Sequence, residues 1–433
     1  MTSPSPDDVP GPLGLSRPAL VVRTIPVPVA QVDDLLGLLP PPVDAGDIVS
    51  WVRKGEGLVG WGTVTTFRSR GSDRFAQAQE WWRTITAEAI VRDDVDEPGT
   101  GPIAFGSMAY SADSRTESVL VVPEVVVGRR GDQAWVTTTT TAAAVPAADE
   151  PLESQPAPAD PGVVTFADRD LTKERWAAAV EEAVDRINAG DLDKVVLARS
   201  VQAMAEERID PRWLLTRLSE DYDTTWVFAV DGLVGATPEM LVRLERGLVT
   251  SRVLAGTIRR TGDDSHDLAL AGSLARSSKD LEEHEYAVRS VADALTDHTS
   301  SINVPDYPFV LHLNNVMHLA TDVAGVVDDS STSLALAAAL HPSAAVCGTP
   351  TADADRVIAE LEHMDRGRYA GPVGWMDASG DGEWGIALRC GSYDGANSLR
   401  LYAGCGIVAG SRAEDEVAES VAKLLPMRTA LGG

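Results

Sequence analysis

The stretch WVFAVDGLVGATPEMLVRLERGLVTSRVLAGTI, residues 226–258, decides the fold class. It consists of apolar, strand-like runs that follow one another as in β-hairpins. Helical patterns are expected later, at about 267–297, 331–340, 352–363 and 412–425, but they do not alternate with strands in a regular βαβ order, and no period repeats. We therefore expect an α+β fold with large antiparallel sheets rather than a doubly wound parallel sheet.

The chain divides into two halves at a segment of low complexity. Residues 142–162, AAAVPAADEPLESQPAPADPG, contain mainly Ala, Pro and acidic residues, a composition typical of an exposed connector. Residues 18–165, which include this connector, are expected to form a β-rich scaffold half, and residues 166–433 the half that carries the chemistry. We expect the two halves to form one integrated domain. Residues 1–17, rich in Pro, Ser and Asp, are expected to be disordered.

The overall charge argues against several classes of partner. With 37 basic and 65 acidic residues, the 433-residue chain has a formal net charge of -28, which repels nucleic acids and anionic membranes. The sequence has no signal peptide and no apolar run of about 18 residues, so we expect a cytoplasmic protein. The cysteines Cys347, Cys390 and Cys405 are too few and too far apart for a disulfide framework, and we expect reduced, buried thiols.

Two residues at the starts of apolar strands are candidates for acid–base chemistry. Only five of the basic residues are lysine, and one of them, Lys194, opens the run KVVLARSVQAM. Burial lowers the pKa of a lysine, which can then act as a base, whereas an arginine keeps its proton. Glu239 follows the Thr-Pro turn in GATPEMLVR, where burial would raise the pKa of its carboxyl and let it donate a proton. The alternatives are a solvated lysine and an exposed turn glutamate.

Two predicted helices each offer a pair of acidic residues on one face. Asp280 and Glu283 share a face in SSKDLEEHEYAVRSV, and Glu416, Glu419 and Lys423 share a face in GSRAEDEVAESVAKL. Two such pairs could together hold one hard cation such as Mg²⁺, with water at the remaining positions. The alternative is that both helices only present solvated charged faces.

Three further features are candidate ligand contacts. Gly404 and Gly406 lie in RLYAGCGIVAGS, residues 400–411, where a strand leads into a helix N-terminus, a natural cradle for a carboxylate or phosphate. A dinucleotide-binding fold is rejected because too little chain remains after that helix. Arg389, alone in the apolar run GIALRCG, must pair with an internal carboxylate or with that of a ligand. His318, in NVMHLATDV, is expected to be a satisfied core histidine unless a ligand lies nearby.

Taken in order, these segments resemble the chorismate-utilising enzymes, a family that includes isochorismate synthase, salicylate synthase, anthranilate synthase component I and aminodeoxychorismate synthase component I. The resemblance covers residues from about 170 to 425 and rests on KVVLAR, GATPEMLVR, LAGTIRR, KDLEEHE, VMHLATDVAG, LHPSAAVCGTPT, RYAGPVGW, GEWGIALRC and YAGCGIVAGS. The pattern is most similar to isochorismate synthases. A lysine at the position of Lys194 is typical of members that activate water, while anthranilate synthases carry glutamine there.

The resemblance implies a reaction, a cofactor and a fold. An isochorismate synthase adds water at C2 of chorismate and removes the C4 hydroxyl, in a Mg²⁺-dependent isomerisation that feeds menaquinone or siderophore biosynthesis. Lys194 would be the general base for the water, and Glu239 the general acid for the departing hydroxyl. The implied fold has large antiparallel sheets packed face to face with helices on the outside. We expect a monomer that needs no glutaminase subunit.

The resemblance also implies a role for each remaining candidate. The metal would be bound by Glu283 and Glu419 directly, and by Asp280 and Glu416 through water. The groups that would position the two substrate carboxylates are Tyr369, Arg389, Gly404, Gly406 and Lys423. The remaining contacts would be Leu254 and Thr257 in the pocket wall and His318 near the reacting ring.

Three alternative functions are considered beside this one. A salicylate synthase shares the lysine and the acid, and would carry the same intermediate on to salicylate and pyruvate. An aminating anthranilate or aminodeoxychorismate synthase is disfavoured by Lys194. A non-catalytic chorismate-binding protein is disfavoured by the complete set of acid, base and metal-binding groups.

Overall fold

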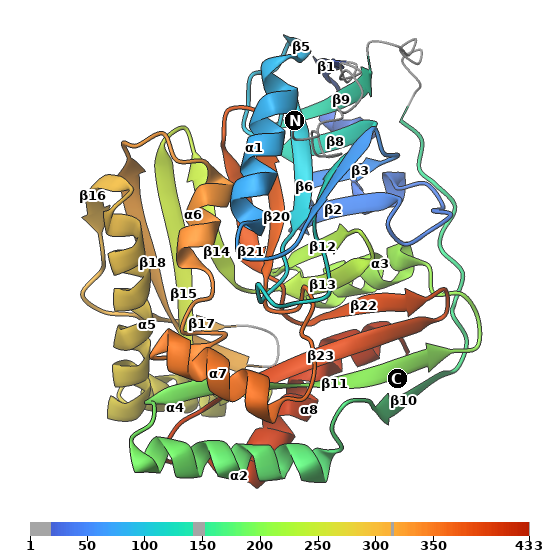
Figure 1. Cartoon of the computed structure of the whole chain (residues 1–433). Helices are drawn as coiled ribbons and strands as arrows, with labels where there is room; N and C mark the ends of the chain where they lie inside the picture. Colours follow the sequence, from blue (N-terminus) through green and yellow to red (C-terminus); the bar gives the residue numbers. More distant parts are fainter. Residues whose placement is uncertain (1–18, 142–151, 313–315, 433) are drawn as a thin grey trace, which may run out of the picture.

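The computed structural model describes residues 19–141, 152–312 and 316–432. In these ranges the chain forms two large, mainly antiparallel β-sheets with eight α-helices around them (Figure 1). The expected α+β class with antiparallel sheets is confirmed. The expected disordered segment, 1–17, and residues 142–151 of the expected connector lie outside the described residues.

The larger sheet has thirteen strands, and one of them begins at Lys194. Its order from edge to edge is β10 (Val164–Asp168), β11 (Lys194–Ala205), β23 (Ser398–Ile407), β22 (Cys390–Gly395), β13 (Leu233–Thr237), β12 (Trp226–Val230), β2 (Ile48–Arg53), β3 (Glu56–Trp61), β8 (Val125–Arg130), β9 (Gln133–Thr141), β1 (Leu20–Pro26) and β5 (Ile90–Asp93), with β19 (Gly348–Thr349) also paired to β11. Among the described strands, only β1 and β5 pair in parallel.

The smaller sheet has ten strands. Its order is β16 (Thr299–Asn303), β18 (Val316–Val327), β15 (Leu248–Arg259), β14 (Met240–Glu245), β21 (Gly382–Ile386), β20 (Pro372–Asp377), β6 (Ile103–Ser107), β7 (Ser118–Val122) and β4 (Thr65–Ser69), with β17 (Phe309–His312) also paired to β18.

Turn chemistry explains why residues 226–258 form hairpins. Between β12 and β13 the two-residue turn is Asp231-Gly232, and between β14 and β15 it is Arg246-Gly247. All four turn residues have positive φ, between 47° and 82°. Two-residue loops of this handedness match the twist of antiparallel strands, and glycine reaches the conformation without steric cost. The stretch therefore supplies hairpin strands to both sheets.

The helices lie on the outer faces of the two sheets (Figure 1). Their bounds are α1 (Arg74–Ala87), α2 (Lys173–Ala189), α3 (Pro211–Asp221), α4 (Asp264–Leu274), α5 (Ser278–Thr296), α6 (Ser333–Leu340), α7 (Thr351–Leu361) and α8 (Ala413–Ala430). Helix α8 packs along β23 and against α2, while α5 packs along β15 and β18. No described helix is long and apolar enough to cross a membrane.

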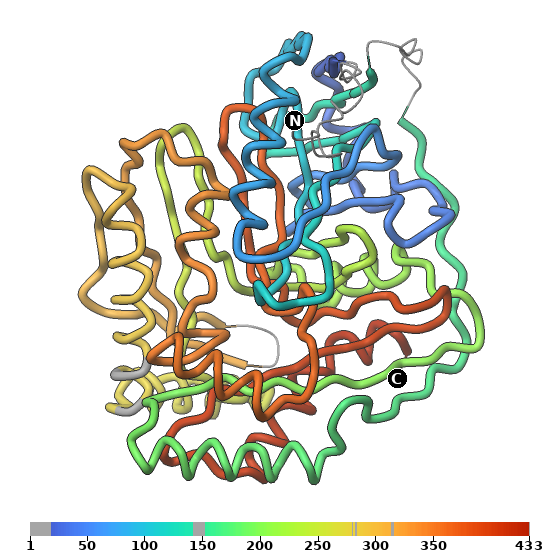
Figure 2. The backbone as a smooth tube through the Cα atoms, in the orientation of Figure 1, coloured from blue at the N-terminus to red at the C-terminus, as the bar shows by residue number. Residues whose placement is uncertain are grey.

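Strands from before and after the connector share both sheets. In the larger sheet β2 pairs with β12, and in the smaller sheet β6 pairs with β20. Figure 2 shows the same interleaving, with blue-green N-terminal segments beside orange-red C-terminal ones. The main core cluster joins strands of both sheets with helices α1, α5 and α6, and it includes Trp51, Phe228 and Trp384. This shared core supports the proposal that the two halves form one integrated domain.

Candidate active site

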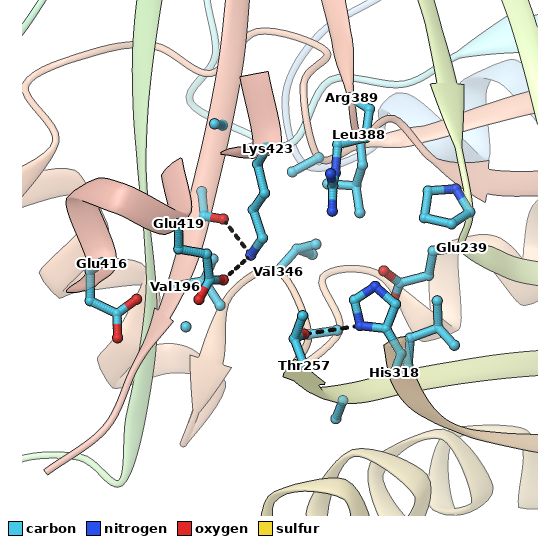
Figure 3. A pocket seen from close by; sticks show the side chains of 18 of the residues that line it. Val196, Glu239, Thr257, His318, Val346, Leu388, Arg389, Glu416, Glu419 and Lys423 are labelled. Atoms are coloured by element: carbon cyan, nitrogen blue, oxygen red, sulfur yellow. Dashed lines mark hydrogen bonds and ion pairs between the residues drawn. The ribbon is translucent and has the colours of Figure 1, made fainter. Parts of the chain in front are cut away.

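One cavity between the two sheets gathers thirteen of the fourteen residues expected in the site. The described lining residues that were expected are Lys194, Glu239, Leu254, Thr257, Asp280, His318, Tyr369, Arg389, Gly404, Gly406, Glu416, Glu419 and Lys423. The fourteenth, Glu283, belongs to α5, but its side chain lies outside the described part of the structure. Figure 3 shows Glu419 and Lys423 on one side of the cavity and Glu239 and His318 on the other.

Lys194 enters the cavity from the first position of β11. Its backbone lies opposite Thr349 of β19, and the strand continues into the fully buried residues Val195 and Leu197. The residue is half-buried, not solvated along its length as a surface lysine would be. The strand therefore directs this lysine into the cavity.

Glu239 is a buried carboxyl with an unusual proton affinity. The residue is only 8% exposed, so the alternative of an exposed turn glutamate is wrong. The Glu239 N–H donates to Thr237 Oγ1 at 3.2 Å, which fixes the turn before β14. Burial raises the pKa of this carboxyl, and the nearby cations Lys194, Lys423 and Arg389 lower it. The net result is a raised pKa of about 7. At neutral pH such a group can hold a proton and give it up.

Arg389 contributes positive charge to the cavity. It sits in the turn before β22 with a φ of 48°, and its guanidinium forms no hydrogen bond or ion pair with any described residue. Burial lowers the pKa of this guanidinium from its ordinary value. Of the two partners expected for Arg389, an internal carboxylate is therefore not found among the described residues. The arrangement suits a carboxylate that arrives with a ligand.

Lys423 joins helix α8 to the glycine-rich strand β23. Its Nζ donates to the carbonyl of Gly404 at 3.0 Å and lies 2.5 Å from Glu419 Oε1 (Figure 3). A Cβ on Gly404 would be 2.9 Å from Tyr369 Oη, so a larger residue would push the phenol away. The Tyr369 ring stacks on Tyr402, with 5.0 Å between ring centroids. These contacts fix a cation, a hydroxyl and exposed backbone along one wall.

Glu416 and Glu419 could hold a cation. One oxygen of each and the sulfur of Cys405 lie within 4.8 Å of one another. Carboxylate oxygens are the donors that a hard divalent cation prefers. The Cys405 thiol is buried, and burial raises its pKa, so it stays protonated and is a poor ligand. The donor chemistry of the two glutamates therefore fits the predicted kind of metal.

Asp280 approaches the same cavity through a β-bulge. The pairing of β15 with β18 shifts at Gly256, which has a φ of 75°. A Cβ at Gly256 would lie 3.1 Å from the Asp280 Cβ, so the absence of a side chain lets the N-terminus of α5 approach the strand. The bulge also places Thr257 directly opposite His318.

His318 is not a fully satisfied core histidine. Its Nδ1 lies 2.9 Å from Thr257 Oγ1, but its buried Nε2 has no hydrogen-bond partner among the described residues. Burial, together with the nearby cations Arg389 and Lys423, lowers the pKa of the imidazole to about 3. The ring is therefore neutral at physiological pH and offers one free nitrogen to a ligand.

Several lining residues were not predicted. They include Val346, Arg366, Tyr402 and Ser411. Arg366 lies two residues before the run RYAGPVGW, and Tyr402 and Ser411 lie in the glycine-rich run, so their neighbourhood was visible in the sequence. Nothing in the sequence showed that these side chains line the cavity.

Comparisons with known proteins agree with this geometry. Residues 45–432 match a family model described as chorismate binding enzyme. The chain is 32% identical over 404 residues to the isochorismate synthase MenF of Bacillus subtilis, covering 87% of this chain and 85% of the relative. A solved structure of the menaquinone-specific isochorismate synthase MenF from Escherichia coli is 26% identical with a TM-score of 0.80, covering 96% of this chain and 95% of that one. A solved structure of a putative 2,3-dihydroxybenzoate-specific isochorismate synthase from Bacillus anthracis is 31% identical with a TM-score of 0.75. The match covers 93% of this chain and 99% of that one.

Proposed function

The chain belongs to the chorismate-binding enzyme family, and we propose that it is an isochorismate synthase. The observation that carries this proposal is the buried carboxyl of Glu239, with a pKa of about 7, in one cavity with Lys194. Water addition and hydroxyl loss need one base and one acid around a single ring. The relatives named isochorismate synthase are similar over most of the chain, which supports the same assignment.

The reaction replaces one hydroxyl by another at a different ring carbon. Lys194, in its neutral form, takes a proton from water as the water oxygen bonds to C2. The ring double bonds shift, the C4–O bond breaks, and Glu239 gives its proton to the departing hydroxide, which leaves as water. Lysine can perform the first step because, unlike arginine, it can lose its proton.

The positive groups of the cavity would bind the two carboxylates of chorismate. Arg389 and Lys423 supply charge, and the free Nε2 of His318 can form a hydrogen bond beside the ring. Because the whole protein is strongly acidic, this local charge is needed to hold a dianion.

We also propose that the cavity binds Mg²⁺ through Glu283 and Glu419, with Asp280 and Glu416 acting through water. The bound cation would neutralise the ring carboxylate of chorismate and hold it in place. Lys423, which pairs with Glu419, would share this wall with the substrate. The product would enter menaquinone or siderophore biosynthesis, and no glutaminase subunit is required because no ammonia is used.

Product analysis tests the proposal. We expect chorismate and Mg²⁺ to give isochorismate without salicylate, and EDTA to stop turnover. Salicylate synthase is the second candidate because it would use the same acid and base, and its product is recognised by fluorescence. Salicylate as the main product would replace the proposed function by that one. Binding of chorismate without any turnover would point instead to a non-catalytic protein.

The pH dependence of the reaction follows from the acid role of Glu239. Only the protonated carboxyl can donate, while the base Lys194 must be neutral, so the slope of log(kcat/KM) for chorismate against pH should decrease by about one as the pH rises through the Glu239 pKa of about 7. Steady-state rates in a series of buffers at constant ionic strength measure this, because kcat/KM reports the ionisation of the free enzyme. A slope that does not decrease across that pKa would contradict the acid role.

A further inference from the structure

One edge of strand β11 lacks a partner strand for part of its length. Along its other edge β11 pairs with β23 from Val195 to Met204. On this edge β19 covers Lys194 and Val195, and β10 covers the strand from Val201 onward. The intervening backbone groups must find other partners, because buried N–H and C=O groups are costly to leave unpaired.

Side chains take the place of the missing strand. Arg366 Nη2 donates to the Val196 carbonyl at 2.7 Å, and the Ala198 N–H donates to Glu362 Oε1 at 2.7 Å. The Ala198 carbonyl accepts from Trp176 Nε1 at 3.1 Å. Glu362 and Arg366 thus satisfy two successive backbone groups of β11, as a neighbouring strand would.

Glu362 and Arg366 also form a buried ion pair. Arg366 Nε donates to Glu362 Oε2 at 2.9 Å. The Arg366 side chain is only 3% exposed, and that of Glu362 only 2%. The Arg366 guanidinium lies over the Tyr110 ring, 4.4 Å from its centroid. Such a pair gains little net stability from its charges alone, because removing both from water is costly. The hydrogen bonds that both side chains also make to the backbone of β11 distinguish this pair from an ordinary buried ion pair.

The ion pair connects two walls of the cavity. Arg366 Nη1 donates to the Val346 carbonyl at 2.8 Å, while Nη2 reaches Val196. Val196, Val346 and Arg366 itself all line the cavity. Lys194 lies two residues before Val196 on β11, and residues two apart in a strand project from the same face. A shift of β11 at Val196 would therefore move Lys194.

We propose that Glu362 and Arg366 are positioning residues, which hold β11 and the Val346 segment together so that Lys194 has a fixed place in the cavity. This inference rests on the proposed function, because it assigns the pair to the geometry of the base. The pair acts through the backbone and does not take part in the proton transfers.

The variant Arg366→Lys tests this role. Lysine keeps the positive charge next to Glu362, but its single nitrogen cannot reach Glu362, Val196 and Val346 in the planar arrangement of a guanidinium. We expect kcat to fall by about 10- to 100-fold, since a displacement of about 1 Å at a catalytic group costs that much. We expect the Kd for chorismate, measured by calorimetry with Mg²⁺, to change by less than about threefold.

A matched control separates positioning from general effects. Glu285 and Arg289 form an exposed pair with the same spacing on α5, so Arg289→Lys should leave kcat and KM unchanged. Glu362→Gln is the second variant: glutamine can still accept from the Ala198 N–H but has no charge for Arg366. It should also lower kcat more than it weakens chorismate binding, and it keeps the test valid if Arg366→Lys does not fold.

The outcomes are distinguishable. Wild-type kcat in a folded Arg366→Lys enzyme would overturn the inference alone, and so would a raised KM with unchanged kcat, which would make Arg366 a substrate contact. If Arg366→Lys does not fold, wild-type kcat in Glu362→Gln would overturn it. A wild-type enzyme that does not convert chorismate would overturn the proposed function, and this inference with it.

Discussion

Lys194→Arg is expected to abolish the conversion of chorismate to isochorismate. The variant keeps a positive charge at the start of β11, but a guanidinium cannot lose its proton in a protein and so cannot accept one from water. Removing a general base typically lowers the rate by about 100- to 10,000-fold. Steady-state product formation measures kcat, and calorimetry with chorismate and Mg²⁺ should show that binding persists.

The control for this variant is Lys173→Arg. Lys173 is exposed at the first position of α2 and does not line the cavity, so the same chemical change should leave kcat unaltered. A Lys194→Arg enzyme with a rate close to wild type would rule out Lys194 as the base. Loss of both binding and turnover would instead indicate that the shape of the lysine side chain is what the site needs.

Glu239→Gln is expected to lower kcat about as much as Lys194→Arg does, because it blocks the donation of a proton to the departing hydroxyl. Glutamine has nearly the same shape as a protonated glutamate and can occupy the turn before β14, but it cannot release a proton to the C4 hydroxyl. We expect kcat to fall by at least about 100-fold while chorismate still binds. Rapid-mixing experiments and steady-state assays on the same preparation would measure chorismate binding and kcat, respectively.

Glu207→Gln provides the matched change at an exposed position outside the cavity, and it should behave like wild type. Substantial steady-state conversion by the Glu239→Gln enzyme would contradict the acid role. In that case the raised pKa of Glu239 would reflect burial without a catalytic purpose.

The candidate site could be predicted largely because its residues lie in short runs with unusual local chemistry. A lysine or glutamate at the mouth of an apolar strand and a lone arginine in an apolar run each conflict with their surroundings, and such conflicts indicate function. The fold class was also accessible, because the Asp-Gly and Arg-Gly turns of residues 226–258 encode hairpins locally.

Long-range pairing could not be predicted in the same way. The pairing of β2 with β12 joins residues that are far apart in the chain, and nothing in either strand specifies the other. Glu362 and Arg366 have the spacing of an ordinary surface pair on a helix end, and only the packing of β11 against them shows that they are buried. The free Nε2 of His318 likewise depends on neighbours from other strands.

The most direct test of the central claim follows the oxygen atom. We predict that the wild-type enzyme, given chorismate and Mg²⁺ in ¹⁸O-labelled water, forms isochorismate whose C2 hydroxyl carries the label, as detected by mass spectrometry and NMR. That result requires an activated water and a departing C4 hydroxyl, the two steps assigned to Lys194 and Glu239. Isochorismate with an unlabelled C2 hydroxyl, or no isochorismate at all, would contradict the account.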